Sequence, residues 1–169
     1  MDRLSAPSRP SAFRALLLIH STPAALRQHI NWAVQSAIGD EISVQWKSQP
    51  LMAGTFRTSV AWRSQFSKAG ELASALRSWH YLNFEIQESD DTAGELFRFT
   101  PELGIHRAVT DLSGAVVVSE NQINSALKIS FDEESLRESL AKLFGTPWDL
   151  ELERFRGVDA HERSHLQAI

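Results

Sequence analysis

Apolar and polar positions at the start of the chain predict a strand followed by a helix. Residues 15–20 form a short continuous apolar run, which is typical of a strand buried on both faces. Over residues 26–38 the apolar positions recur at helical spacing, and Gly39 follows directly as a stop signal. Ser21 or Thr22 can cap this helix at its N-terminus.

Three further strand patterns and a second helix follow. Apolar and polar residues alternate with the period of a half-buried strand at 42–46, 56–62 and 82–86, and a helical stripe lies at 72–79. The order is therefore β-α-β-β-α-β over about residues 15–89, which is the ferredoxin-like, split βαβ plan. Two right-handed crossovers place both helices on one face of an antiparallel sheet, so the opposite face stays bare unless something covers it.

The second half of the chain predicts additional short strands and three C-terminal helices. The strands are expected at 95–100, 105–109 and 115–119. Capping boxes at Ser119 with Gln122 and at Ser130 with Glu133 open two helices, and Thr146 opens the third. Because amphipathic helices need an apolar surface on which to dock, we expect these helices to cover the bare face of the sheet.

The chain is expected to be an α+β protein with one folded domain over residues 14–157. This domain divides into a ferredoxin-like half at 14–90 and an extension of strands and helices at 91–157. The polar ends predict a disordered N-terminal arm at 1–13 and a C-terminal tail at 158–169.

Composition narrows the classes of function. The chain has 169 residues and no cysteine, which excludes disulfides, thiolate nucleophiles and cysteine-based metal sites. Its formal net charge of −4 provides no overall attraction to nucleic acid or anionic lipid. The longest apolar run, 15–19, is far shorter than the roughly 20 residues of a membrane span, and no signal peptide is recognisable. We expect a cytoplasmic protein without a cofactor or a bound metal.

Several short motifs together resemble a known family. They include His20-Ser21, Trp46 with Gln49-Pro50, Thr100-Pro101 with Leu103-Gly104-Ile105, and Pro147-Trp148-Asp149. With these motifs the sequence resembles an actinobacterial protein family of unknown function, over about residues 14–156. Genes of that family often lie near type II fatty acid synthesis genes, so the resemblance implies a setting in fatty acid supply. It implies no activity and no catalytic residue.

The end of the first strand is the first candidate ligand site. His20, Ser21 and Thr22 lie just before a predicted helix N-terminus, where backbone amides and the helix dipole favour an anion. The alternative is that Ser21 or Thr22 only caps the helix while His20 bonds to the backbone. An enzyme built here would combine His20 and Ser21 with His106 or Arg107 from a later segment, within hydrogen-bond reach of one another.

Aromatic residues supply the remaining candidates. His29 and Trp32 lie one turn apart on the first predicted helix. There His29 is either an acid-base group or a boundary residue that bonds to a carbonyl. Trp148 begins an acidic helix, and an indole exposed at that position marks a binding surface.

These features predict a non-catalytic binding or regulatory module. The resemblance implies acyl carrier protein or a fatty acid synthase component as its partner. Local positive charge for such an acidic partner is expected from Arg27, Arg57, Arg63 and Arg77. The alternatives are the His-based enzyme and a metabolite-sensing dimer. Neither nucleic acid nor a membrane is an expected partner, and a homodimer is left open.

Overall fold

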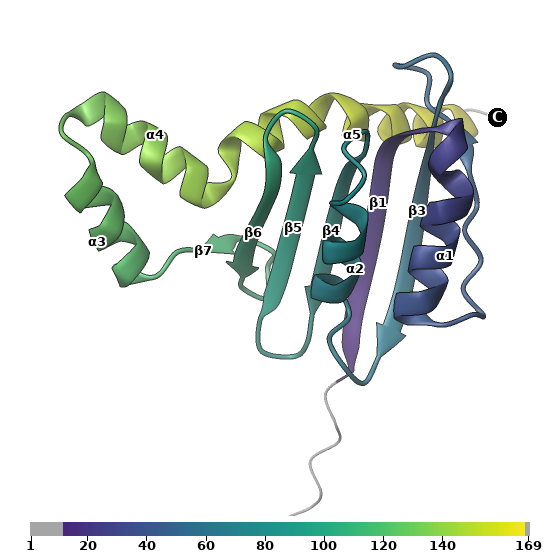
Figure 1. Cartoon of the computed structure of the whole chain (residues 1–169), viewed down its shortest axis with the longest axis horizontal. Helices are drawn as coiled ribbons and strands as arrows, with labels where there is room; N and C mark the ends of the chain where they lie inside the picture. The colour runs from purple at the N-terminus through teal and green to yellow at the C-terminus, as the bar shows by residue number, and fades with distance from the viewer. Residues whose placement is uncertain (1–11, 168–169) are drawn as a thin grey trace, which may run out of the picture.

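The computed structural model describes residues 12–167, with residues 159–167 described by their backbone alone. The predicted N-terminal arm therefore lies almost entirely outside the described residues. Within them the chain forms an α+β structure with a seven-stranded antiparallel sheet and five α-helices (Figure 1). No helix in the described part is long and apolar enough to cross a membrane.

Each strand of the sheet is antiparallel to its neighbours, in the order β2-β3-β1-β4-β5-β6-β7. The strands are β1 (Phe13–Pro23), β2 (Lys47–Ser48), β3 (Thr55–Ser64), β4 (Asn83–Ser89), β5 (Gly94–Thr100), β6 (Gly104–Thr110) and β7 (Val116–Val117). The helices are α1 (Arg27–Ile38), α2 (Ala69–Leu76), α3 (Glu120–Ile129), α4 (Glu133–Phe144) and α5 (Thr146–Gln167), with a short 3-10 helix at Ala24–Leu26.

The main core lies between the sheet and the helices α1 and α2, on the side that we call the helix face (Figure 1). Alternate residues of each strand point to this face, so Leu17 and Ile19 of β1 are buried there. Phe84 of β4 stacks on Phe99 of β5 with ring centroids 5.3 Å apart. Ile30 and Val34 of α1 are completely buried against this layer.

Helix α5 crosses the opposite side of the sheet, which we call the α5 face (Figure 1). Its buried side chains Leu152 and Phe155 pack there, and Phe155 stacks on His20 of β1. The expectation that all three C-terminal helices cover this face is wrong, because α3 and α4 form a helical hairpin that projects past the β7 edge (Figure 1). The backbone of α5 also continues to Gln167, through most of the stretch predicted to be a tail.

Two predictions in the first half are wrong for local reasons. Residues 42–46 form no strand, and only the two residues of β2 pair with β3. The alternation there reflects packing instead, since Trp46 is half-buried against the core and donates its Nε1–H to Asn31 Oδ1 at 3.0 Å. Ser21 and Thr22 cap no helix, because β1 runs on through Pro23 and α1 begins only at Arg27, without a side-chain cap.

The second half follows its sequence signals more closely. The capping box of Ser119 with Gln122 opens α3 as predicted. At α4 the box is formed by Asp132 with Ser135 instead of Ser130 with Glu133. Gly145 ends α4 with a φ of 75°, a left-handed conformation that favours glycine.

Candidate functional site

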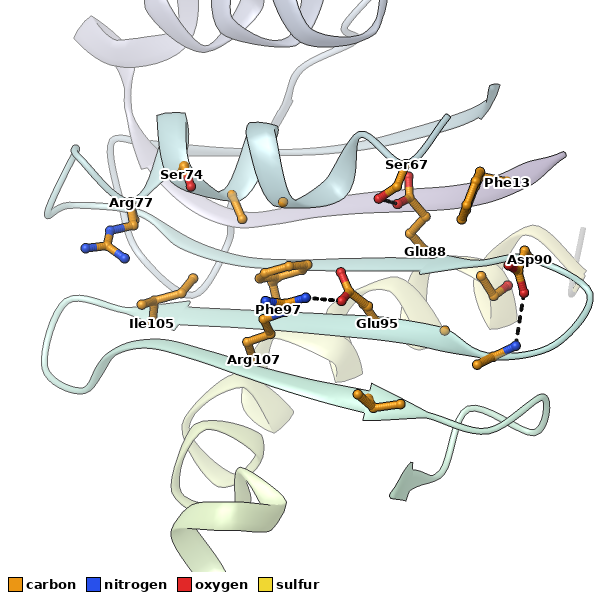
Figure 2. Close-up of a pocket in the computed structure, with 16 residues that line it drawn as sticks. Phe13, Ser67, Ser74, Arg77, Glu88, Asp90, Glu95, Phe97, Ile105 and Arg107 are labelled. Carbon is orange, nitrogen blue, oxygen red and sulfur yellow. Dashed lines mark hydrogen bonds and ion pairs between the residues drawn. The ribbon is translucent and has the colours of Figure 1, made fainter. Parts of the chain in front are cut away.

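A groove lies on the helix face where the sheet is wider than the helices that cover it. Neighbouring strands are about 4.8 Å apart and packed helices about 10 Å apart, so two helices cover about four strands. Beyond α2, no described helix lies over β6 on this face (Figure 2). The resulting groove has a volume of about 700 Å³ and runs along the strands between α2 and β6.

Apolar side chains line the floor of the groove, and the ion pair of Arg107 with Glu95 crosses its middle (Figure 2). Phe97 of β5 is 5% exposed, Ile105 of β6 is half-buried and Val109 is 51% exposed. The wall on α2 is made of the small residues Gly70 and Ser74, together with the buried Ala73. A Cβ built on Gly70 would lie 3.9 Å from the ring of Phe97, so the helix and the floor are already in contact at that point.

Charged residues mark the rim. Arg77 lies at one end of the groove, beside Ile105, and Asp90 lies at the other (Figure 2). Arg77 is exposed, and its side chain makes no hydrogen bond or ion pair with any residue that the structure describes. Arg107, in contrast, is paired with Glu95 across β5 and β6 and lies 5.7 Å from the centroid of the Phe97 ring.

Glu88 fixes the wall of the groove in place. Its side chain is buried, at 3% exposure, and its carboxylate accepts hydrogen bonds from Lys68 N at 3.0 Å and Ala69 N at 3.3 Å, and another from the hydroxyl of Ser67. Helix α2 has no capping side chain of its own, so this carboxylate from β4 satisfies its first amides. Glu88 therefore fixes α2, which forms one wall of the groove, to β4 of the sheet.

The predicted site at the end of β1 is closed by packing. His20 is the residue at which β1 bulges, since it pairs with neither β3 nor β4. Its Nε2 lies 2.7 Å from Glu85 Oε2, and its carbonyl accepts a hydrogen bond from Gln49 Nε2 at 2.7 Å. Ser21 Oγ contacts Met52 Sδ at 3.5 Å, and Thr22 is completely buried. No helix begins at these residues, so the expected anion site at a helix N-terminus is absent from the described fold.

Glu85 joins His20 to α5 through a buried ion-pair cluster. Its carboxylate accepts hydrogen bonds from Arg98 Nε at 3.2 Å and Arg156 Nε at 3.1 Å, and both arginines also reach Asp149. Burial by itself would raise the pKa of Glu85, but the hydrogen bonds with His20 and Arg156, and their charges, lower it to about 2. Burial would lower the pKa of Arg156, but its hydrogen bonds with Glu85 and Asp149, and their charges, raise it. The cluster thus clamps α5 to the sheet and keeps Glu85 ionised.

His106 and Trp148 form a second contact of α5 with the sheet. The two rings lie 4.8 Å apart, and Trp148 donates its Nε1–H to Gly104 O at 2.9 Å. His106 Nε2 lies 3.1 Å from Leu143 O, and burial lowers the pKa of this histidine. The indole of Trp148 is therefore used within the chain rather than left exposed for a ligand.

The structure does not bring together the groups that the enzyme hypothesis requires. His20, Ser21 and His106 contact Glu85, Met52 and Leu143 respectively, and Arg107 lies on the opposite face in the groove. Two other candidate residues, both on α1, do contact each other. There His29 and Trp32 are both exposed, with ring centroids 5.5 Å apart, and His29 lies 6.4 Å from Trp79.

The four arginines expected to attract an acidic partner are also dispersed. Arg57 lines a small cavity with His20 and Phe155 on the α5 face, and Arg63 follows on the same side of β3. Arg27 lies over the ring of Phe56 at 3.9 Å. Arg77 alone of the four lines the groove. Sequence reasoning therefore named two residues of the groove, Arg77 for its charge and Arg107 for the enzyme hypothesis, and missed its apolar floor residues and its small-residue wall. The spacing of Gly70, Ala73 and Ser74 along one helix face was the signal that could have found that wall.

Fold and site together define an α+β protein whose antiparallel sheet carries an open groove on its helix face. The chain belongs to the family described as "Protein of unknown function (DUF3145)", which matches residues 16–167. No curated protein and no solved structure matches the chain.

Proposed function

We propose that the protein is a non-catalytic binding module that holds a small amphipathic anion in the groove between α2 and β6. The observation that carries this proposal is an exposed arginine at the end of an apolar floor. Arg77 has no partner among the described side chains, and Ile105 and Phe97 begin the floor beside it. Ligand sites of proteins combine an apolar lining of several hundred Å³ with a few charged groups in this way.

The chemistry of the groove favours a ligand with an anionic head and an apolar body. A carboxylate or phosphate group would pair with the guanidinium of Arg77, which can donate two parallel hydrogen bonds. An apolar body would then lie along the floor toward Val109. Ile105 and Val109 are four residues apart on one strand, so the floor is roughly 13 Å long, the reach of a medium-length alkyl chain. Arg107 is engaged by Glu95 and supports the floor rather than the anion.

Calorimetric titration with a straight-chain carboxylate tests this proposal. We expect decanoate to bind more tightly than octanoate, and 1-decanol, which lacks the charge, to bind more weakly than decanoate. Ser74→Trp fills the groove from an exposed position on α2 and should abolish binding. Ala75→Trp is the matched control, since Ala75 is also exposed on α2 but does not line the groove.

Arg77→Gln separates the charge from the apolar floor. We expect this variant to bind decanoate at least about tenfold more weakly, because a hydrogen bond to a charged group is lost, while binding of 1-decanol stays unchanged. Equal binding of decanoate by the wild type and the Ser74→Trp variant, or equal losses in Ser74→Trp and Ala75→Trp, would contradict the proposal.

Acyl carrier protein, or a synthase component, stays the first protein partner to test. Its support is the resemblance described above, together with a groove whose dimensions suit an alkyl chain. A pull-down at low salt should recover it with the wild type and lose it with Ser74→Trp. Equal recovery with the wild type and with Ser74→Trp would show that the partner does not bind in the groove.

For the fold, we propose that residues 13–89 are a ferredoxin-like unit. In support, β2, β3, β1 and β4 are neighbours in that order, all antiparallel, with α1 and α2 on one face. In this view β5, β6 and β7 widen the unit and thereby create the groove.

A further inference from the structure

The groove between α2 and β6 carries opposite charges at its two ends. Of the described residues that line it, five are ionisable: Arg77, Glu88, Asp90, Glu95 and Arg107. Arg77 lies at one end, whereas Glu88 and Asp90 lie toward the other (Figure 2). Arg107 and Glu95 pair with each other between the ends, so their charges cancel. An anion at Arg77 accounts for one end of this arrangement and leaves the acidic end unexplained.

The charge of Asp90 is available to a ligand, whereas that of Glu88 is not. Glu88 is buried, and its carboxylate already accepts hydrogen bonds from the first amides of α2. Asp90 uses Oδ1 for the turn between β4 and β5, where this atom accepts hydrogen bonds from the hydroxyl of Thr92, from Thr92 N and from Ala93 N. These bonds, that of the hydroxyl most, lower the pKa of Asp90 and keep it ionised. Its Oδ2 accepts no hydrogen bond from any residue that the structure describes.

An aromatic ring lies beside this carboxylate. Arg14 of β1 pairs with Ser89 of β4, so the antiparallel register places Phe13 next to Asp90. Phe13 and Asp90 both line the groove, and Figure 2 shows their side chains at the same end. The neighbouring Arg14 pairs with Asp91 and leaves Asp90 to the groove. A carboxylate beside an aromatic ring attracts an ammonium group, which forms an ion pair with the first and a cation–π contact with the second.

The separation of the two ends sets the length of the ligand. Asp90 N donates to Ala93 O, so Asp90 lies next to Gly94, which pairs with Thr110 of β6. The other end lies beside Ile105 of the same strand (Figure 2). Five residues of a strand span roughly 17 Å. An extended alkyl chain of about twelve carbons covers this length.

We propose that the ligand of the groove is a long-chain zwitterion, with its anionic group at Arg77 and an ammonium group held by Asp90 and Phe13. This inference rests on the binding function proposed for the groove and names the second head group of its ligand. The charges at the two ends also fix the direction of the ligand, because the reverse orientation would place each head group against a like charge. The neutral pair of Arg107 and Glu95 favours neither direction.

Calorimetric titration of the full chain with dodecanoate and 12-aminododecanoate tests the second head group. The two ligands share the carboxylate and differ in the ammonium group at the far end. Asp90→Asn removes the charge and keeps a side-chain oxygen that can accept the hydrogen bonds of the turn. We expect this variant to bind 12-aminododecanoate about fivefold more weakly than the wild type does, which is the upper range for an exposed ion pair. Its binding of dodecanoate should stay unchanged.

Two further variants separate the ammonium site from general effects on the fold. Asp111→Asn is the matched control, because Asp111 accepts the same kind of turn hydrogen bonds between β6 and β7 but does not line the groove. It should change the binding of neither ligand. Phe13→Leu keeps an apolar side chain and removes the ring, so it should weaken 12-aminododecanoate about threefold and leave dodecanoate unchanged.

The outcomes distinguish this inference from the function on which it rests. Unchanged binding of 12-aminododecanoate in Asp90→Asn, or an equal loss of both ligands in that variant, would overturn the zwitterion. In either case, binding of dodecanoate by the wild type and not by Ser74→Trp would still support the groove as a site for an amphipathic anion. If the wild type binds neither ligand, the zwitterion and the proposed function both fail.

Discussion

The two ends of the sheet differ in how completely they are covered. Strands β3, β1 and β4 are enclosed by α1 and α2 on one face and, at one end, by α5 on the other. Strands β6 and β7 extend past α1 and α2 on the helix face, and the groove and the α3–α4 hairpin lie at this end of the sheet. The enclosed part contains most of the buried core, whereas the extension provides open apolar surface.

The largest contrast is expected between a side chain at the centre of the core and one on the groove floor. Phe84 is completely buried and stacked on Phe99, so Phe84→Ala should lower the free energy of unfolding by about 3–5 kcal/mol. Val109→Ala, at a half-exposed position, should lower it by less than about 1 kcal/mol. Urea unfolding measures both. Similar losses in the two variants would show that the extension is as tightly packed as the core.

Loss of the Glu85 carboxylate is expected to lower the free energy of unfolding by a smaller amount than Phe84→Ala, and this loss depends on pH. Glu85→Gln should destabilise the protein by about 3 kcal/mol at pH 7, because Arg156 and His20 lose a buried anionic partner. The pKa of Glu85 is about 2 in the folded protein against 4.5 ordinarily, so its stabilisation is complete above about pH 4.5.

That stabilisation is lost as the pH falls toward 2, because the unfolded chain takes up the proton first. The difference in unfolding free energy between the wild type and Glu85→Gln should therefore shrink between pH 4.5 and 2. Chemical denaturation across this range provides the measurement. A difference that stays constant with pH would mean that Glu85 is not ionised within the cluster.

The smallest expected difference in stability concerns Gly145, where α4 meets α5. Gly145 and Gly54 have similar positive φ values, 75° and 78°, but a Cβ on Gly145 meets His106 whereas one on Gly54 meets nothing within 4 Å. Gly54→Ala should cost about 1 kcal/mol from backbone strain alone, and Gly145→Ala about 2 kcal/mol or more. Thermal unfolding can compare the two. Equal costs would indicate that the junction of α4 and α5 yields easily.

Some local signals predicted the fold correctly. The stop at Gly39 and the capping box at Ser119 each depend on a few neighbouring residues, and the structure confirms them. Alternation was misleading at 42–46, where side chains pack against the core without a partner strand. A period of two reports which side chains are buried, and it does not report whether the backbone is paired.

The candidate site was mostly beyond what local patterns reveal. Strand and helix periodicity were sufficient for an α+β chain with an antiparallel sheet, because burial on one side imposes that periodicity on each element separately. Whether His20 is open or closed was decided by Glu85, which bonds to it, and by Phe155, which stacks on it from more than a hundred residues away in sequence. The groove, likewise, exists because two helices are too narrow for seven strands, a mismatch that arises only when all the elements are assembled.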